Sequence, residues 1–300
     1  MKKKLVSMIT AAAMTAALLA GCGTAAEEPA AETEVQTEQA AEEAAEPEQP
    51  AEEAAEPKEP AEEVPAEEAV SGELMIAAAA SLENSLTNEI IPLFNEKYPD
   101  VTVTGTYDSS GKLQTQIEEG APVDVFFSAS TKQTDALAEG GLIDQADIVN
   151  LLENKIVLIV PEGTEADYAE FTDITKAKAV AIGDPESVPA GQYAQESLTN
   201  LGIWEDVLAK ASLGTNVTEV LNWVAEGSAD AGIVYATDAA QTEKVAIIGA
   251  APADSVKPAI YPAAMVKDCP NPAAAKAFVE FLQTPEIIKV FEANGFTSAL

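Results

Sequence analysis

From Glu73 onward, the sequence alternates short apolar runs with segments in which apolar residues recur at helical spacing. The run Leu74-Met75-Ile76-Ala77, for example, is followed by apolar side chains three or four residues apart between Leu82 and Phe94. Strands separated by helices favour an α/β fold with mainly parallel strand pairing. Apolar strands need cover on both faces, and this segment is long enough for two lobes that share a cleft.

Periodicity and turn residues give approximate bounds for each expected element. The expected strands are 74–77, 101–103, 123–127, 155–160, 180–182, 232–235, 245–248 and 261–266. The expected helices are 82–94, 113–117, 134–139, 193–201, one that follows Val217, and 273–283, which we expect to close the fold before Pro285.

The first 22 residues have the pattern of an export signal. Three lysines at positions 2–4 precede an apolar stretch that is too short and too rich in alanine for a strong membrane span. The stretch ends in Leu19-Ala20-Gly21-Cys22, which resembles the lipobox of bacterial lipoproteins. That resemblance implies cleavage before Cys22 and attachment of lipid to it. The alternative is an ordinary signal peptide with an incidental cysteine.

Residues 23–72 are expected to form a disordered acidic tether rather than a domain. The segment consists mainly of alanine, glutamate and proline, and Val35, Val64 and Val70 are its only large apolar side chains. Such a composition buries too little surface to offset the entropy of ordering the chain. The tether would be a spacer between the membrane and the folded part, or a segment with no role beyond solubility.

Charge limits the classes of partner and of site. The formal net charge is −35, and all 16 basic residues are lysines, so the chain contains no arginine and no histidine. Nucleic acid is excluded as a partner, because phosphate backbones attract Lys and Arg. The chain also lacks the bidentate anion fork, the commonest general base and the commonest metal ligand. An anion site would therefore use lysines, hydroxyl groups or backbone N–H groups.

Four places combine small or hydroxyl residues with the start of a helix. A helix N-terminus leaves several N–H groups unpaired and carries partial positive charge, so it favours anions. Four such termini around one cleft could hold a dianion without a cationic side chain. The four places are Ala80-Ser81-Leu82, Ser109-Ser110-Gly111, Pro189-Ala190-Gly191 and Asn216-Val217-Thr218.

Each of these places also has a purely structural interpretation. Ser81 could be the N-cap of its own helix, and the two serines at 109–110 could be ordinary turn residues. Asn216 and Glu219 could form an approximate capping box. Tyr235, at the end of an apolar run, could belong to the core. Taken singly, the structural interpretation is favoured for each; their joint occurrence in order favours a site.

Together with Ser109-Ser110-Gly111, seven stretches along the chain carry a resemblance to a known family. They are Ala78-Ala79-Ala80-Ser81-Leu82, Gly120-Ala121-Pro122-Val123-Asp124-Val125-Phe126, Gly183-Asp184-Pro185, Val188-Pro189-Ala190-Gly191, Gly232-Ile233-Val234-Tyr235, Tyr261-Pro262-Ala263-Ala264 and Asn294-Gly295-Phe296-Thr297. The most specific is the block from Gly-Asp-Pro to Pro-Ala-Gly-x-Tyr-Ala. Over residues 74–300 this set resembles the periplasmic molybdate-binding proteins of ABC importers.

The resemblance implies a type II periplasmic-binding-protein fold, with two α/β lobes and the ligand in the interlobe cleft. It implies lobe 1 over 73–157 plus 259–300 and lobe 2 over 158–258. The ligand would be molybdate or tungstate, with no cofactor and no protein-coordinated metal cation. The ligand contacts would be the hydroxyl and N–H groups of Ser81 and Ser110, the N–H groups of Ala190 and Val217, and the phenol of Tyr235.

The resemblance further implies an extracytoplasmic, monomeric protein, held at the membrane by lipid on Cys22, that works with an ABC permease and its ATPase. Cavity size would separate molybdate and tungstate from sulfate, because their bonds to oxygen are longer. Phosphate carries a proton at neutral pH and would call for an acceptor, which none of the five mapped positions offers. Three alternatives stay open. The ligand could be sulfate, phosphate or a small carboxylate. The chain could be a serine hydrolase, although no base accompanies its serines. It could also be a structural lipoprotein or adhesin.

Overall fold

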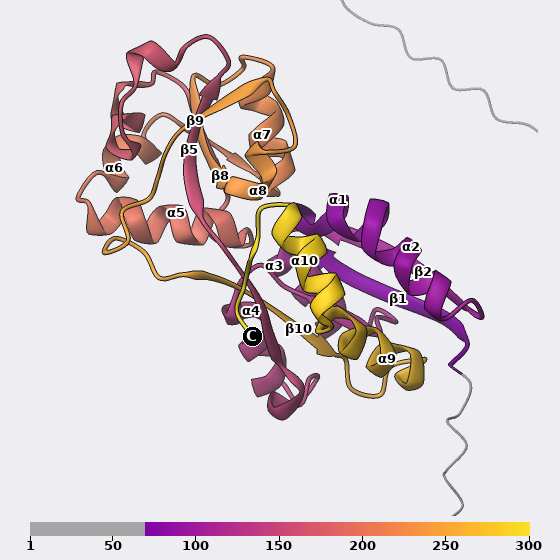
Figure 1. Cartoon of the computed structure of the whole chain (residues 1–300). Coiled ribbons are helices and arrows are strands. Elements are labelled where there is room, and N and C mark those ends of the chain that lie inside the picture. Colours follow the sequence, from indigo (N-terminus) through magenta and orange to yellow (C-terminus); the bar gives the residue numbers. More distant parts are fainter. Residues whose placement is uncertain (1–69) are drawn as a thin grey trace, which may run out of the picture. The chain divides into compact units, whose positions relative to one another are not determined.

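The computed structural model describes residues 70–300 (Figure 1). The predicted signal peptide, the lipid-attachment residue Cys22 and the predicted tether up to residue 69 lie outside the described residues. The first strand begins at Gly72, at the predicted end of the tether. The alternation of strand and helix predicted from residue 73 onward is confirmed, and it builds two separate sheets.

The first sheet has six strands in the order β11-β4-β10-β3-β1-β2. Strand β1 pairs in parallel with β2 and β3, whereas β10 runs antiparallel to both β3 and β4. The strands are β1 (Gly72–Ala79), β2 (Val101–Asp108), β3 (Val125–Phe127), β4 (Val149–Asn154), β10 (Ala259–Met265) and β11 (Thr297–Ser298).

The second sheet has five strands in the order β7-β6-β8-β5-β9. Strand β6 pairs in parallel with β7 and β8, and β5 runs antiparallel to β8 and β9. The strands are β5 (Ile156–Pro161), β6 (Val180–Gly183), β7 (Ala211–Gly214), β8 (Ala231–Tyr235) and β9 (Val245–Ala250).

The expectation of mainly parallel pairing is wrong, because both sheets are mixed. Strand direction depends on where the chain goes between strands, and here it leaves the first sheet and later returns to it. The strands that flank these passages, β4, β5, β9 and β10, all pair antiparallel. Alternating strand and helix patterns carry no information about such passages, so the sequence could not supply the direction.

Helices cover both faces of the first sheet. On β1, Leu74 and Ile76 face one core with Phe94 and Phe278, while Ala77 faces a second core with Leu113. The period of two along a strand sends neighbouring side chains to opposite faces, which explains why β1 is apolar from Leu74 to Ala79. The helices of this lobe are α1 (Glu83–Ser85), α2 (Ile91–Lys97), α3 (Ser110–Glu118), α4 (Thr131–Glu139), α9 (Pro272–Leu282) and α10 (Pro285–Ala293).

The first helical run is interrupted in the middle. A 3-10 turn (Ala80–Leu82) leads into α1, and a π segment (Leu86–Ile90) separates α1 from α2. Pro92 lies at the start of α2 and has no N–H to donate to the preceding turn, which accounts for the change of helical form just before it.

Two helices, α5 (Pro189–Asn200) and α7 (Val217–Ala225), pack against strands β6 and β8 of the second sheet. Two short helices, α6 (Trp204–Leu208) and α8 (Ala236–Ala239), complete this lobe. Further 3-10 turns lie at Gln145–Asp147, Glu165–Asp167 and Phe171–Lys176. The predicted closing helix is followed by one more, α10, because Pro285 begins a helix at its first position instead of ending one.

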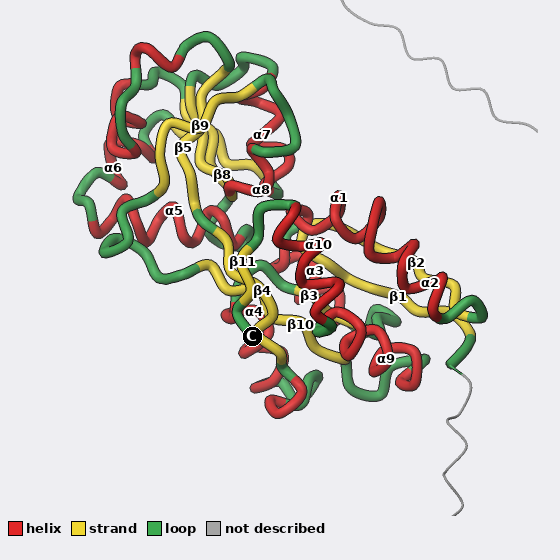
Figure 2. The backbone as a smooth tube through the Cα atoms, in the orientation of Figure 1, coloured by secondary structure: helices red, strands yellow, loops and turns green. Residues whose placement is uncertain are grey.

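The chain passes between the sheets twice. Strand β4 ends at Asn154 in the first sheet and β5 begins at Ile156 in the second, so Lys155 alone joins them. The return runs from Ala250 to Ala259, and Figure 2 shows β4, β10 and β11 side by side at this passage. We call each sheet with its helices a lobe. The sequence placed Ile156 and Val157 in lobe 1, whereas both pair with β8 in the second sheet.

Candidate functional site

One small cavity lies between the two lobes, and all five predicted ligand-binding residues line it. The first lobe contributes seven lining residues, Ala79, Ala80, Ser81, Asp108, Ser109, Ser110 and Ala129. The second lobe contributes five, Val188, Pro189, Ala190, Val217 and Tyr235. The space that can hold the centre of a water molecule is about 10 Å³, which suits roughly one water. The cavity therefore has no room for an extended ligand in this arrangement of the lobes.

Three helices begin at the cavity wall. Helix α3 begins at Ser110, α5 at Pro189 and α7 at Val217, so the helix starts predicted in these three places are confirmed. The N–H groups of a first turn have no partner within their own helix. Those of Ser110, Ala190 and Val217 therefore remain as donors from residues that line the cavity, each at the positive end of a helix dipole.

Two glycines allow the backbones around these helix starts to approach closely. The N–H of Gly111 donates to the carbonyl of Ser187 across the lobes, at 3.0 Å, and a Cβ at Gly111 would collide with that carbonyl. A Cβ at Gly191 would collide with the carbonyl of Gly183, where α5 meets β6. The glycines of these motifs thus place α3 and α5 around the cavity.

Ser81 is not an N-cap. The residue before the first helical turn is Ala79, and the Ser81 hydroxyl is instead hydrogen-bonded to the Tyr261 hydroxyl at 2.9 Å. The Asn154 side chain donates to Tyr261 at 3.2 Å and to the Thr237 hydroxyl at 2.8 Å. This buried chain of hydrogen bonds connects a cavity residue of the first lobe with α8 of the second.

Tyr235 is fully buried at the end of β8, and its hydroxyl donates to the carbonyl of Ala129 in the first lobe at 3.1 Å. Burial raises the pKa of this phenol well above its usual range, so the hydroxyl keeps its proton and its ability to donate. Its ring lies edge-on to Tyr261, with centroids 5.3 Å apart. The tyrosine is therefore a core residue whose one hydroxyl proton is engaged by Ala129, so its phenol would donate to a ligand only by exchanging that bond.

The serine pair at the start of α3 is more than a turn. The Ser110 hydroxyl accepts from the N–H of Ala129 at 3.0 Å, which leaves its own proton to donate. Ser109 is 3% exposed, and its hydroxyl oxygen has no hydrogen-bond partner among the described residues. A buried hydroxyl without a partner is costly, so this one suits a polar ligand. Sequence reasoning named Ser109 in the motif but mapped no contact to it.

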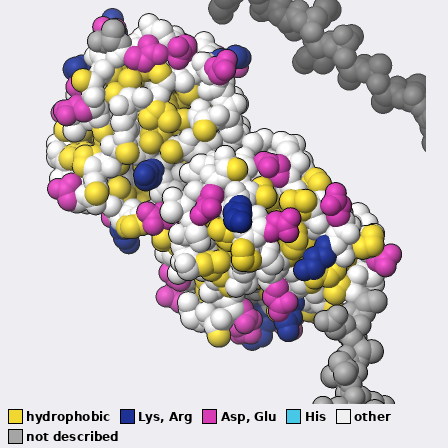
Figure 3. All heavy atoms as spheres, viewed as in Figure 1, with side chains coloured by type: hydrophobic (Ala, Val, Ile, Leu, Met, Phe, Trp, Pro, Cys, Tyr) yellow, Lys and Arg dark blue, Asp and Glu magenta, His cyan; other side chains and the backbone are white. Residues whose placement is uncertain are grey.

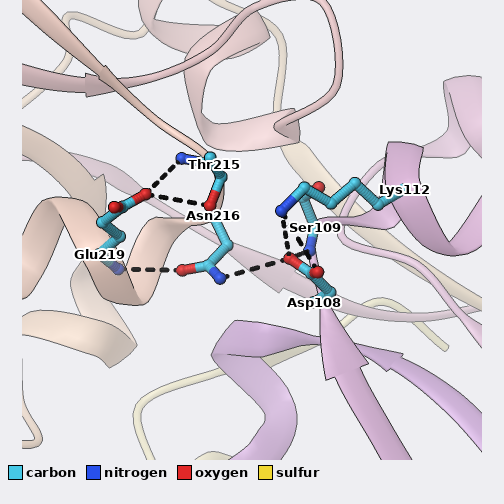
Figure 4. Close-up of polar contacts among 6 residues, drawn as sticks. All are labelled: Asp108, Ser109, Lys112, Thr215, Asn216 and Glu219. Carbon is cyan, nitrogen blue, oxygen red and sulfur yellow. Dashed lines mark hydrogen bonds and ion pairs between the residues drawn. The ribbon is translucent and has the colours of Figure 1, made fainter. Parts of the chain in front are cut away.

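Asp108, the last residue of β2, was missed altogether as a site residue. It is the one charged side chain in the cavity lining within residues 70–300. Its Oδ1 accepts from the Ser109 N–H at 2.8 Å, from Lys112 Nζ at 3.2 Å and from Asn216 Nδ2 at 3.3 Å (Figure 4). Asn216 caps α7 as predicted, since its Oδ1 accepts from the Glu219 N–H at 2.9 Å. Its bond to Asp108 crosses from one lobe to the other.

The surroundings of the cavity offer no long-range attraction for an anion. A larger open groove of about 500 Å³ shares Ala80 with the cavity lining and carries Glu83, Glu219 and Glu226. On the face seen in Figure 3, acidic side chains and lysines are interspersed without a basic patch. Within residues 70–300, no group of three acidic or cysteine side chains is placed to hold a metal ion. Any attraction must come from the local N–H and hydroxyl donors.

Residues 74–297 match the family of bacterial extracellular solute-binding proteins. The chain belongs to this family. It is 42% identical over 225 residues to YvgL of Bacillus subtilis (strain 168), whose name describes an ABC transporter substrate-binding lipoprotein; the match covers 75% of this chain and 86% of YvgL. It is 36% identical over 235 residues to ModA of Escherichia coli (strain K12), named a molybdate-binding protein, with 76% of this chain and 90% of ModA covered.

A solved structure confirms the fold of this solute-binding protein. It is named as the substrate-binding domain of a molybdenum ABC transporter of Clostridium difficile and is 37% identical, with a TM-score of 0.60. The match covers 76% of this chain and 99% of that domain. The two-lobe α/β fold and the family resemblance expected from the motifs are thus confirmed. No helix between residues 70 and 300 is both long and apolar enough to cross a bilayer.

The buried carboxyl of Asp238, beside Tyr235, predicts a pH-dependent contribution to stability. Burial raises its pKa from 3.8 to about 7, and its Oδ2 accepts from the Tyr235 N–H at 3.1 Å. Between these two pH values the native state holds a proton that the unfolded chain has lost, so the contribution of Asp238 falls as pH rises. The isosteric Asp238→Asn variant removes that dependence.

We expect the free energy of unfolding of the wild type to fall relative to that of Asp238→Asn between about pH 4 and pH 7. The slope should be at most about 1.4 kcal/mol per pH unit, and the difference should be constant above that range. Urea denaturation at a series of pH values measures it. A difference that does not change with pH would show that Asp238 does not titrate in this way.

Proposed function

We propose that this solute-binding protein captures molybdate, or the similar tungstate, and delivers it to an ABC permease and its ATPase. The observation that carries the proposal is the convergence of three helix N-termini and several hydroxyl groups on one small interlobe cavity. The relatives named for molybdate or molybdenum support the same ligand class. The protein would act as a monomeric binding component with no enzymatic activity.

The donor set suits a tetrahedral dianion. The N–H groups of Ser110, Ala190 and Val217 come from three helices, and the hydroxyls of Ser81, Ser109 and Ser110 add side-chain donors. Tyr235 would donate by exchanging its bond to Ala129 for one to the ligand. Hydrogen bonds to an ionised acceptor are shorter and stronger than neutral ones, and a dry cavity strengthens them further. Donors from both lobes would be brought together by one ligand, so binding would favour the closed arrangement.

Asp108 changes the argument about selectivity. The sequence suggested that phosphate would find no acceptor for its proton, but the structure adds this carboxylate to the lining. Its Oδ1 already accepts three hydrogen bonds and Lys112 also contacts Oδ2 at 3.3 Å, so little acceptor capacity remains for a ligand. Discrimination would then depend on the length of the bonds from the central atom to oxygen, which separates molybdate and tungstate from sulfate and phosphate.

Calorimetric titration of the purified protein with molybdate, tungstate, sulfate and phosphate tests the ligand assignment. We expect tight binding of molybdate and tungstate, and weak or undetectable binding of the other two anions. Equal affinity for sulfate would place the protein among general oxyanion carriers. Absence of binding by all four anions would overturn the proposal and direct the search to small carboxylates.

The N–H of Val217 can be removed without changing the side-chain surface greatly. Val217 is the first residue of α7, and Asn216 before it has the extended backbone that precedes proline (φ −155°, ψ 172°). Val217→Pro therefore removes one donor where proline is tolerated. We expect affinity for molybdate to fall by roughly 10- to 100-fold, the range for a hydrogen bond to a charged group.

Thr131→Pro is the matched control, because it places proline at the first position of α4, which contributes no residue to the cavity. Calorimetry on both variants, with thermal unfolding to confirm folding, gives the comparison. A folded Val217→Pro variant that binds like the control would remove Val217 from the site.

The lipid anchor remains part of the proposal. It is supported by the Leu19-Ala20-Gly21-Cys22 sequence after three lysines, and by the lipoprotein name of the relative YvgL. In bacteria that express the full chain, labelled palmitate should be incorporated into the wild type and not into Cys22→Ala. Incorporation into the Cys22→Ala variant, or none into the wild type, would contradict attachment at Cys22.

A further inference from the structure

We propose that Asp108 and Asn216 form an interlobe pair that holds the first turn of α7 in its closed position over the cavity. The inference rests on the proposed function, because it assigns a positioning role at the same site. It concerns two residues for which the motifs suggested either no role or only a capping role. Figure 4 shows the contacts on which it depends.

The amide of Asn216 is oriented by its own helix. Its Oδ1 accepts from the N–H of Glu219 at 2.9 Å, and so Nδ2 is left free to donate. Glu219 in turn accepts from the N–H and hydroxyl of Thr215 at 2.7 and 3.0 Å, which fixes the residue before Asn216. The N-terminal turn of α7 therefore presents a donor in a defined direction, and that donor meets Asp108 at 3.3 Å.

Asp108 is held just as firmly on the first lobe. The N–H of Ser109 and the ammonium of Lys112 both bind its Oδ1, at 2.8 and 3.2 Å. Lys112 offsets the negative charge, which would otherwise repel an anion in the cavity that both Asp108 and Val217 line. The carboxylate can thus remain beside an anion site because three hydrogen-bond donors compensate its negative charge.

The pair acts on the ligand through Val217, which directly follows Asn216. If the Asp108–Asn216 bond holds Asn216 against the first lobe, it also sets the distance between the Val217 N–H and the donors of Ser110. Both residues are positioning residues, since neither is required to touch the ligand. Their effect should appear in the closure of the lobes as well as in affinity.

A charge exchange tests the pair. Asn216→Asp keeps the N-cap of α7, because aspartate caps helices as well as asparagine does, but it sets two carboxylates against each other. The double variant Asp108→Asn/Asn216→Asp restores an amide–carboxylate bond in the reverse direction, and Asp108→Asn completes the cycle. Asn222→Asp is the matched control, since it adds the same charge to the same helix at an exposed position that has no bond to Asp108.

Two measurements on the full chain show whether the pair holds the lobes together. The first is acrylamide quenching of Trp223 in a Trp204→Phe background without added anion; Trp223 lines the groove that also holds Ala80 of the first lobe. The second is calorimetric affinity for molybdate. For Asn216→Asp we expect more quenching and an affinity lower by roughly tenfold or more. We expect no such change in Asn222→Asp, and recovery of both quantities in the double variant.

An Asn216→Asp variant that matches Asn222→Asp in both measurements, or a double variant without recovery, would overturn the pair. Failure of the ligand assignment has a different signature. In that case the wild type binds no molybdate, while the quenching series still shows whether the pair holds the lobes together.

Discussion

The first-turn N–H groups of α3, α5 and α7 cannot be satisfied within their own helices, and the interlobe cavity depends on that constraint. The two sheets hold the three helices so that Ser110, Pro189 and Val217 begin them at one place. The close backbone contacts at Gly111 and Gly191 leave no room for a side chain, so the approach of the helices fixes the residue type. A polar ligand bound there would accept hydrogen bonds from the N–H groups that the helices leave unpaired.

The chain contains no arginine or histidine and no lysine lines the cavity, so an anion bound there would be held by neutral donors. Dipoles act over short distances, so the donors have to be close and well aimed before they contribute. Lys112 reinforces this arrangement indirectly: it binds Asp108 at 3.2 Å and does not line the cavity. The cation thus neutralises a neighbouring carboxylate instead of binding the ligand.

Local features of the sequence predicted the parts of the site that depend on local chemistry. Asn216 as a cap and the helix starts at Ser110 and Val217 follow from residue preferences within one turn, and all are confirmed. Features set by distant segments were not predictable in this way. The mixed strand directions, the strand β4 with its polar Asn150 and Glu153, and the meeting of Asp108 with Asn216 all depend on how the chain crosses between the sheets.

Besides the bonds of Gly111 to Ser187 and of Tyr235 to Ala129, two further polar links join the lobes near the cavity. One runs from Ser81 through Tyr261 and Asn154 to Thr237, and the other joins Asp108 to Asn216. Hydrogen bonds have preferred lengths and directions, so two of them together restrict how far the lobes can close. Closure in turn fixes the size of the cavity. If the ligand is selected by the length of its bonds to oxygen, selectivity resides in these interlobe contacts as much as in the donors that touch the anion.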